Sequence, residues 1–175
     1  MHRRRSVLLF LAFASLAAAQ PPAAHGPSID RVGLPDRAGM TLLRTTPATN
    51  GTELLMIYAN GPAASVGDLD RLPYPNGAVF AAEWRRAVPG PDGQAQPGEL
   101  LRIDVMRRGP GFGEAYGADR SGEWEYVQYH PDGSHRVAPA QSGQCASCHR
   151  RAGAPRDFVF RGRFPPADAT RMGGD

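Results

Sequence analysis

Two cysteines and a histidine near the C-terminus constrain this chain more than any other feature of its sequence. Cys145, Cys148 and His149 form a Cys-x-x-Cys-His motif in a chain of 175 residues. Two thiols one helical turn apart can each form a thioether to a haem vinyl group, and the adjacent imidazole can ligate the iron. The motif therefore predicts one covalently attached haem c per chain, with His149 as the metal ligand. Only 175 − 149 = 26 residues follow this histidine, so the preceding chain must form the haem pocket.

Other uses of the two cysteines fit the sequence less well. A redox disulfide of this spacing belongs to a βαβ unit, and the residues before Cys145 show no such pattern. A zinc site needs four ligands, whereas Cys145, Cys148 and His149 are the only clustered candidates. A structural disulfide in an exported protein and a zinc site are the alternatives to haem.

The N-terminus has the layout of a secretory signal peptide. Three arginines at positions 3–5 precede the apolar run SVLLFLAFASLAAA, and Ala17 and Ala19 supply the small residues of a cleavage site. The run is shorter than a membrane span requires, and an uncleaved anchor is the alternative. We expect residues 1–19 to be removed and the mature protein to be periplasmic, with no membrane segment.

The charge of the mature chain gives no reason to expect a nucleic-acid partner. All 20 residues counted as Lys or Arg are arginine, and the formal net charge is +3. Removal of residues 1–19 takes away three arginines, which leaves 17 − 17 = 0. A neutral chain lacks the basic balance that favours nucleic acid or an acidic membrane surface. The remaining 175 − 19 = 156 residues are enough for one domain with its own core.

Short β-like runs separated by turn residues make up most of the mature chain. Runs that alternate apolar and polar residues predict half-buried strands, and clusters such as PATNG predict the turns between them. The predicted strands are Met40–Thr46, Thr52–Asn60, Ala78–Ala87, Glu99–Arg108 and Glu123–His130, with a short final strand at Asp157–Phe160. We therefore predict a mainly β or α+β fold: a single domain with an antiparallel sheet of about five strands, a few short helices and a C-terminal haem-attachment turn.

The expected organisation of the chain has four parts. The signal peptide at 1–19 is followed by an extended N-terminal arm at 20–38, which is rich in Pro, Ala and Gly. The haem domain occupies residues 39–164. Residues 165–175 have the composition of a flexible tail.

Five stretches of the chain occur together in an order that is typical of one known family. They are IYANGPAA (57–64), YPNGAVFAAE (74–83), LRIDVMRRGPGFG (101–113), GEWEYVQY (122–129) and the haem motif followed by DFVF. In this ordered set the chain resembles the cytochrome P-460 family, including its cytochrome c′-beta branch. The resemblance implies an antiparallel β-sheet domain, usually a homodimer. It also implies a pentacoordinate c-type haem with its histidine on one face and the opposite face open to small ligands.

One position departs from the pattern of the enzymatic members of this family. Members that oxidise hydroxylamine carry a haem-cross-linked lysine in the strand after the Tyr-Pro turn, and Ala82 occupies that position here. The chain has no lysine, so this cross-link cannot form and hydroxylamine oxidation is not the expected activity. The sequence looks closer to the cytochrome c′-beta type, which is associated with binding nitric oxide or carbon monoxide. We therefore expect a small diatomic ligand.

The alternation of strand residues suggests what lines the open face of the haem. Successive side chains point to opposite faces, so Phe80, Ala82 and Trp84 point together. If Ala82 faces the haem as its lysine counterpart does, Phe80 and Trp84 flank the iron. An apolar aromatic face favours binding of neutral diatomics over multi-proton redox chemistry. The alternative is that both aromatics are ordinary core residues.

Two other functions have candidate residues. An electron carrier that serves a redox partner protein needs a sixth iron ligand, and the candidates are Met56, Met106, His130 and His135. An oxidoreductase that converts hydroxylamine, nitric oxide or peroxide without the cross-link needs a distal carboxylate, and Glu123 and Glu125 share one strand face. The alternative is that both are solvated strand residues. Several arginines could bind the haem propionates or dock an acidic redox partner; they are Arg150, Arg151, Arg156, Arg161 and Arg163.

Overall fold

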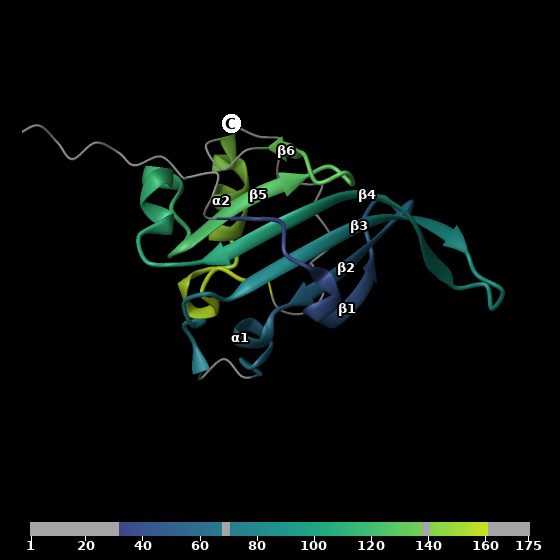
Figure 1. Ribbon diagram of the computed structural model, residues 1–175, viewed down its shortest axis with the longest axis horizontal. Coiled ribbons are helices and arrows are strands. Elements are labelled where there is room, and N and C mark those ends of the chain that lie inside the picture. The colour runs from purple at the N-terminus through teal and green to yellow at the C-terminus, as the bar shows by residue number, and fades with distance from the viewer. Residues whose placement is uncertain (1–31, 68–70, 138–140, 161–175) are drawn as a thin grey trace, which may run out of the picture.

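The computed structural model describes residues 32–67, 71–137 and 141–160, which form a single antiparallel sheet with a few short helices. The six strands follow one another in sequence order across the sheet (Figure 1). They are β1 (Thr41–Pro47), β2 (Glu53–Ala59), β3 (Val79–Pro89), β4 (Ala95–Arg108), β5 (Trp124–Tyr129) and β6 (His135–Val137). The helices are η1 (Arg37–Gly39), α1 (Gly61–Ala64), η3 (Phe112–Asp119), α2 (Gly143–Arg150) and η5 (Ala154–Arg156). The predicted fold class is confirmed.

The first five strands lie where the sequence predicts them, within a few residues, except that the hairpin between β3 and β4 is longer. β3 extends to Pro89 and β4 begins at Ala95, so part of the predicted loop PGPDGQAQPG is strand. This hairpin projects well beyond the rest of the sheet (Figure 1). The sixth strand, β6, has only three residues, too few for a periodic pattern.

The predicted final strand at Asp157–Phe160 is wrong. Asp157 and Phe158 have φ angles of 46° and 60°, whereas β-strands need strongly negative φ. The segment instead forms a turn after η5. Phe158, Val159 and Phe160 have the composition of a strand, but hydrogen bonds from distant residues to Asp157 decide the backbone.

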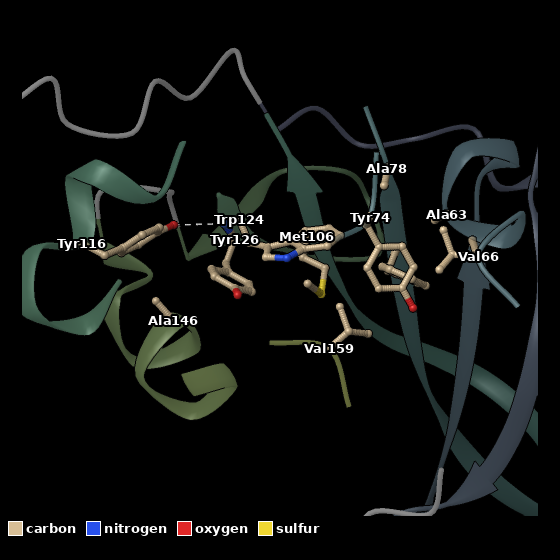
Figure 2. Packing of buried hydrophobic residues seen from close by; sticks show 12 residues of the cluster. Ala63, Val66, Tyr74, Ala78, Met106, Tyr116, Trp124, Tyr126, Ala146 and Val159 are labelled. Carbon is tan, nitrogen blue, oxygen red and sulfur yellow. Dashed lines mark hydrogen bonds between the residues drawn. The ribbon is translucent and has the colours of Figure 1, made fainter. Parts of the chain in front are cut away.

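Opposite faces of the sheet carry the two apolar clusters of the molecule. One cluster consists of Val32, Ala81, Ile103, Val105, Val127 and Tyr129. The other, drawn in Figure 2, gathers side chains from β3, β4, β5, α1, α2 and the C-terminal segment, among them Tyr74, Phe80, Met106, Tyr126 and Val159. Because strand residues alternate between faces, β3, β4 and β5 each contribute to both clusters. The chain from Val32 to η1 crosses the first face, and α2 lies on the second (Figure 1).

The described part of the predicted N-terminal arm packs against the sheet. Val32 is fully buried, and its carbonyl accepts a hydrogen bond from the Tyr129 hydroxyl at 2.5 Å. Arg37 forms an ion pair with the buried Glu83. The predicted signal peptide at 1–19 and tail at 165–175 lie outside the described residues. No helix in the described ranges is long and apolar enough to cross a membrane.

Candidate haem site

A cavity of about 760 Å³ opens on the face of the sheet that carries α2. Pockets that hold cofactors and drug-sized ligands measure about 300–1,000 Å³, so this volume suits a large planar cofactor. Side chains of β1 to β5, α1, α2 and the last described residues line it. One row of paired residues crosses the floor of the cavity from β1 to β5: Arg44, Ile57, Ala82, Asp104 and Gln128.

Helix α2 brings Cys145, Cys148 and His149 to the wall of this cavity. Both cysteines are free thiols and half-buried. Ala146, on the same helix, is fully buried in the apolar cluster and orients the helix. Burial, the nearby Asp104 carboxylate and Cys148 raise the pKa of the Cys145 thiol to about 11. The helix therefore offers two thiols and one imidazole to whatever occupies the cavity.

A second contact holds α2 through its first residues. The hydroxyl oxygens of Tyr116 and Ser142 are 2.7 Å apart and share a hydrogen bond. Tyr116 also accepts a hydrogen bond from the Tyr126 backbone N–H at 3.0 Å, drawn as a dashed line in Figure 2. Tyr116 in η3 thus ties the start of α2 to β5.

The His149 ring is oriented by one hydrogen bond and two aromatic neighbours. Its Nδ1 lies 2.8 Å from the Phe158 carbonyl oxygen; because a carbonyl only accepts, Nδ1 carries the proton. The ring centroid lies 4.8 Å from that of Tyr126 and 5.2 Å from that of Phe160. Burial lowers the pKa of the imidazole, which favours the neutral form. This tautomer leaves Nε2 as the nitrogen with a free lone pair for a metal.

Phe80, Ala82 and Trp84 share the face of β3 that borders the cavity, as the alternation predicts. Phe80 is also a core residue: its ring packs edge-on against Tyr74 at 5.2 Å and lies 5.9 Å from Trp124. The two interpretations of this aromatic are therefore compatible. The methyl side chain of Ala82 fills little of the cavity at its position between Ile57 of β2 and Asp104 of β4.

The expectation of a wholly apolar face is wrong, because Asp104 also lines the cavity. Its Oδ2 accepts a hydrogen bond from Trp84 Nε1 at 2.7 Å. Its Oδ1 is buried without a hydrogen-bond partner among the described residues, and the Arg102 Nε atom lies 3.7 Å away. Burial raises the pKa of this carboxyl group more than Arg102 and Trp84 lower it. In the sequence, Asp104 alternates with apolar residues and has the pattern of a solvent-facing residue.

Neither glutamate considered as a distal carboxylate lines the cavity. Glu123 accepts a hydrogen bond from the Gly111 N–H at 2.6 Å and pairs with Arg120. Glu125 is fully buried, so it is not a solvated strand residue, and its side chain lies on the opposite face of β5 from Tyr126. Strand alternation alone could not show which face of β5 the cavity occupies.

Of the four candidates for a sixth ligand, Met106 borders the cavity and is 7% exposed. Met56 lies on the other face of β2, where its sulfur is 4.0 Å from the Tyr58 hydroxyl. His130 is an exposed turn residue. His135 is exposed and stacks on Tyr129 with ring centroids 5.0 Å apart.

The arginines after the motif lie mainly at the surface. Arg150 pairs with Asp119 at 3.5 Å, Arg151 donates to the Cys148 sulfur at 3.0 Å, and Arg156 is exposed. Arg161 and Arg163 lie outside the described residues. Among the described residues, the arginine that lines the cavity is Arg44 of β1, which the sequence analysis did not single out.

Arg44 is partly desolvated, as expected of a cation at the wall of a cavity. It donates to the Phe160 carbonyl at 3.4 Å, and burial lowers its pKa.

The zinc alternative requires a group of at least three metal-binding side chains. Among the described residues, no group of three or more His, Cys, Asp and Glu side chains is arranged to hold a metal ion.

An antiparallel sheet with a cofactor-sized cavity on one face, lined by a helix that carries two thiols and an imidazole, has the features of a β-sheet haem protein. The sequence model of the family described as Cytochrome P460 matches residues 38–161, more than half of the chain. The chain belongs to the cytochrome P460 family and is a haem-binding cytochrome. No protein with a curated description matches the sequence.

Proposed function

We propose that this protein is a periplasmic mono-haem c-type cytochrome that binds a small neutral ligand, such as nitric oxide or carbon monoxide, opposite His149. Cys145 and Cys148 attach the haem through thioethers, and His149 Nε2 is the single protein ligand of the iron. The observation that carries the proposal is the His149 Nδ1 contact with the Phe158 carbonyl at 2.8 Å, because it leaves Nε2 with a free lone pair on a residue that lines the cavity together with both cysteines.

The residues of the cavity fit a planar, largely apolar cofactor. Phe80, Met106 and Tyr126 supply apolar surface and are each at most 7% exposed. Arg44, at the β1 side of the cavity, can pair with a propionate carboxylate. The haem supplies the iron at which a small ligand binds; the protein supplies the imidazole, the covalent anchor and the shape of the opposite face.

The proposal includes three features that the N-terminus and the family resemblance support. The chain is exported with removal of residues 1–19, it functions in the periplasm, and it forms a homodimer. The intact mass of the purified protein, which should equal residues 20–175 plus one haem, checks cleavage and attachment together. Gel filtration of the same sample checks the dimer.

Absorption and resonance Raman spectra of the ferrous protein without added ligand test the proposed coordination. We expect a five-coordinate, high-spin iron with one histidine ligand, which becomes six-coordinate or loses its histidine when nitric oxide is added. A six-coordinate, low-spin ferrous iron in the absence of added ligand would contradict the proposal.

The electron-carrier alternative can be tested in the same experiment. Met106 is the candidate sixth ligand at the cavity, so Met106→Leu would convert a low-spin spectrum to a high-spin one. Met56→Leu is the matched control, since Met56 lies on the other face of the sheet.

A second function is favoured by the position of Asp104. A half-buried carboxyl group whose pKa is raised by desolvation, at the edge of the cavity, can act as a proton donor or acceptor. This is the role that an oxidoreductase converting hydroxylamine or nitric oxide without the lysine cross-link would require. Replacement of Asp104 separates this function from ligand binding alone.

A further inference from the structure

The turn that follows η5 has an unusual backbone. Asp157 and Phe158 are consecutive, and both have positive φ angles of 46° and 60°. Residues with a Cβ rarely adopt this region, and a bulky aromatic residue does so least readily. Two such residues in a row persist only where surrounding contacts hold them.

Contacts from three separate segments, the loop before β3 and the strands β4 and β5, hold Asp157. Its Oδ2 accepts hydrogen bonds from the Tyr74 backbone N–H at 2.9 Å and from Arg108 Nε at 3.1 Å. Its backbone carbonyl accepts a hydrogen bond from Trp124 Nε1 at 2.8 Å. Asp157 is 6% exposed and Trp124 is fully buried, so water competes little for these bonds.

The same turn directs the next carbonyl toward the haem-attachment helix. The Phe158 N–H donates to the Gly153 carbonyl at 3.0 Å, and the Phe158 carbonyl accepts the His149 Nδ1–H at 2.8 Å. Only one peptide unit separates the anchored Asp157 from the acceptor of this imidazole. A shift of Asp157 therefore moves the acceptor.

We propose that Asp157, held by Arg108 and Trp124, is a positioning residue that sets the strength of the bond between His149 and the iron. An acceptor on the second ring nitrogen fixes the orientation of a ligating histidine and raises the basicity of the ligating nitrogen. Loss of the anchor weakens this acceptor and makes His149 a weaker donor. The inference rests on the proposed ligation by His149 and adds the residue that tunes it.

The test uses the ferrous holoprotein and variants that differ in how much of the anchor they keep. Asp157→Gly removes the carboxylate but tolerates positive φ, and Arg108→Gln removes its cationic partner. Asp157→Asn keeps one acceptor oxygen and the size of the side chain. Glu99→Gln is the matched control, because it breaks an exposed acid–arginine pair with Arg86 at 3.2 Å on the β3–β4 hairpin.

Two readouts distinguish this role from a merely structural one: the iron–histidine stretching band in resonance Raman spectra, and the reduction potential. We expect the band to move to lower frequency and the potential to rise in Asp157→Gly and Arg108→Gln, because a less basic imidazole stabilises ferric iron less. Asp157→Asn should show a smaller change, and Glu99→Gln none.

The proposal is overturned if Asp157→Gly or Arg108→Gln folds with full haem content and keeps the parent band and potential. If Asp157→Gly fails to fold, the other two variants decide: the proposal is overturned if Arg108→Gln and Asp157→Asn fold with full haem content and keep the parent band and potential. The unsubstituted protein separates the two proposals. If it lacks an iron–histidine band, the ligation by His149 is wrong, whereas a parent band that no variant shifts contradicts only the role of Asp157.

Discussion

Asp104 and Ala82 are directly opposite each other on β4 and β3, and together they define the chemistry of the cavity floor. Ala82 adds no functional group, and the resemblance places the cross-linking lysine of the enzymatic relatives at this position. Asp104 adds an ionisable group whose Oδ1 has no hydrogen-bond partner among the described residues. Of the two proposed functions, ligand binding alone and proton-coupled chemistry, the second therefore depends on the carboxyl group of Asp104.

Asp104→Asn tests whether this carboxyl group transfers protons. If the protein converts hydroxylamine, we expect turnover to fall by about 10²-fold or more, because a positioned acid or base contributes about 10²–10⁴ to a rate. If the protein only binds a ligand, the parent shows no turnover to lose, and the variant still binds nitric oxide or carbon monoxide. Steady-state assays with an electron acceptor, together with ligand titrations, provide the measurement.

Glu123→Gln is the control for this substitution. Glu123 is an acidic residue of the same region whose contacts are with Gly111 and Arg120 rather than with the cavity. Equal losses of turnover in the two variants would show that the effect is not specific to Asp104.

Part of the site could be predicted residue by residue from the sequence. The cavity-facing set Phe80, Ala82 and Trp84 follows from strand alternation once one of its members is assigned to a face. Asp104 was missed because alternation shows which residues share a face but not which face is buried. Its position follows from the β3–β4 register and from α2 on the same side of the sheet.

At the scale of elements, the close approach of η3 to the turn that leads into β5 depends on one glycine. Gly113 is buried, and a Cβ built on it would lie 1.8 Å from the Gly122 carbonyl oxygen. Since that neighbour is backbone, the two segments must separate to admit any side chain. Tyr116 of η3, which holds both Ser142 and β5, would move with them.

We therefore expect Gly113→Ala to lower the free energy of unfolding by about 1–3 kcal/mol, the usual cost of overpacking. Urea unfolding of the holoprotein measures it. Gly61→Ala is the control, because a Cβ at this position in α1 meets nothing within 4 Å, and alanine is favoured over glycine in helices by up to about 1 kcal/mol. Equal free energies of unfolding of the two variants would mean that η3 and the turn before β5 separate without loss of stability.

Strands in which apolar and polar residues alternate were predicted well from the sequence, whereas elements without this alternation were not. Strands β1 to β5 carry that period or are bounded by turn residues. The segment Asp157–Phe160 has a strand-like composition, but its backbone is decided by hydrogen bonds from Tyr74, Arg108 and Trp124. These partners are 33 to 83 residues away in sequence, so no local pattern contains them.

On the scale of the whole molecule, the candidate haem cavity and the apolar core share residues. The cluster around Phe80, Met106 and Tyr126 lines the cavity as well as packing internally. A cofactor that binds only the folded chain stabilises it. The proposed thioethers would also join α2 to a group that contacts the sheet, so that cofactor attachment and folding would be coupled.

Removal of both anchors tests this coupling. In Cys145→Ala/Cys148→Ala we expect acid–acetone extraction to remove the haem, which the parent protein retains. We also expect the variant without haem to have a melting temperature more than about 5 °C below that of the parent holoprotein. In a chain of this size, a change of 1 kcal/mol in the free energy of unfolding corresponds to about 2–4 °C. Calorimetry provides the measurement. Ser147→Ala, an exposed change between the two cysteines, should match the parent, and haem retention by the double variant would contradict covalent attachment.

The sequence by itself determined the fold class, five of the six strands, the family and the motif at which a haem is expected. These properties depend on local patterns: the two-residue period of strands, the glycine and proline of turns, and the fixed spacing of Cys145, Cys148 and His149. The tertiary structure decided which face of the sheet the cavity occupies, that Asp104 lines it, and that the Phe158 carbonyl holds His149. Those properties depend on register and on hydrogen bonds between distant residues, which sequence periodicity does not encode.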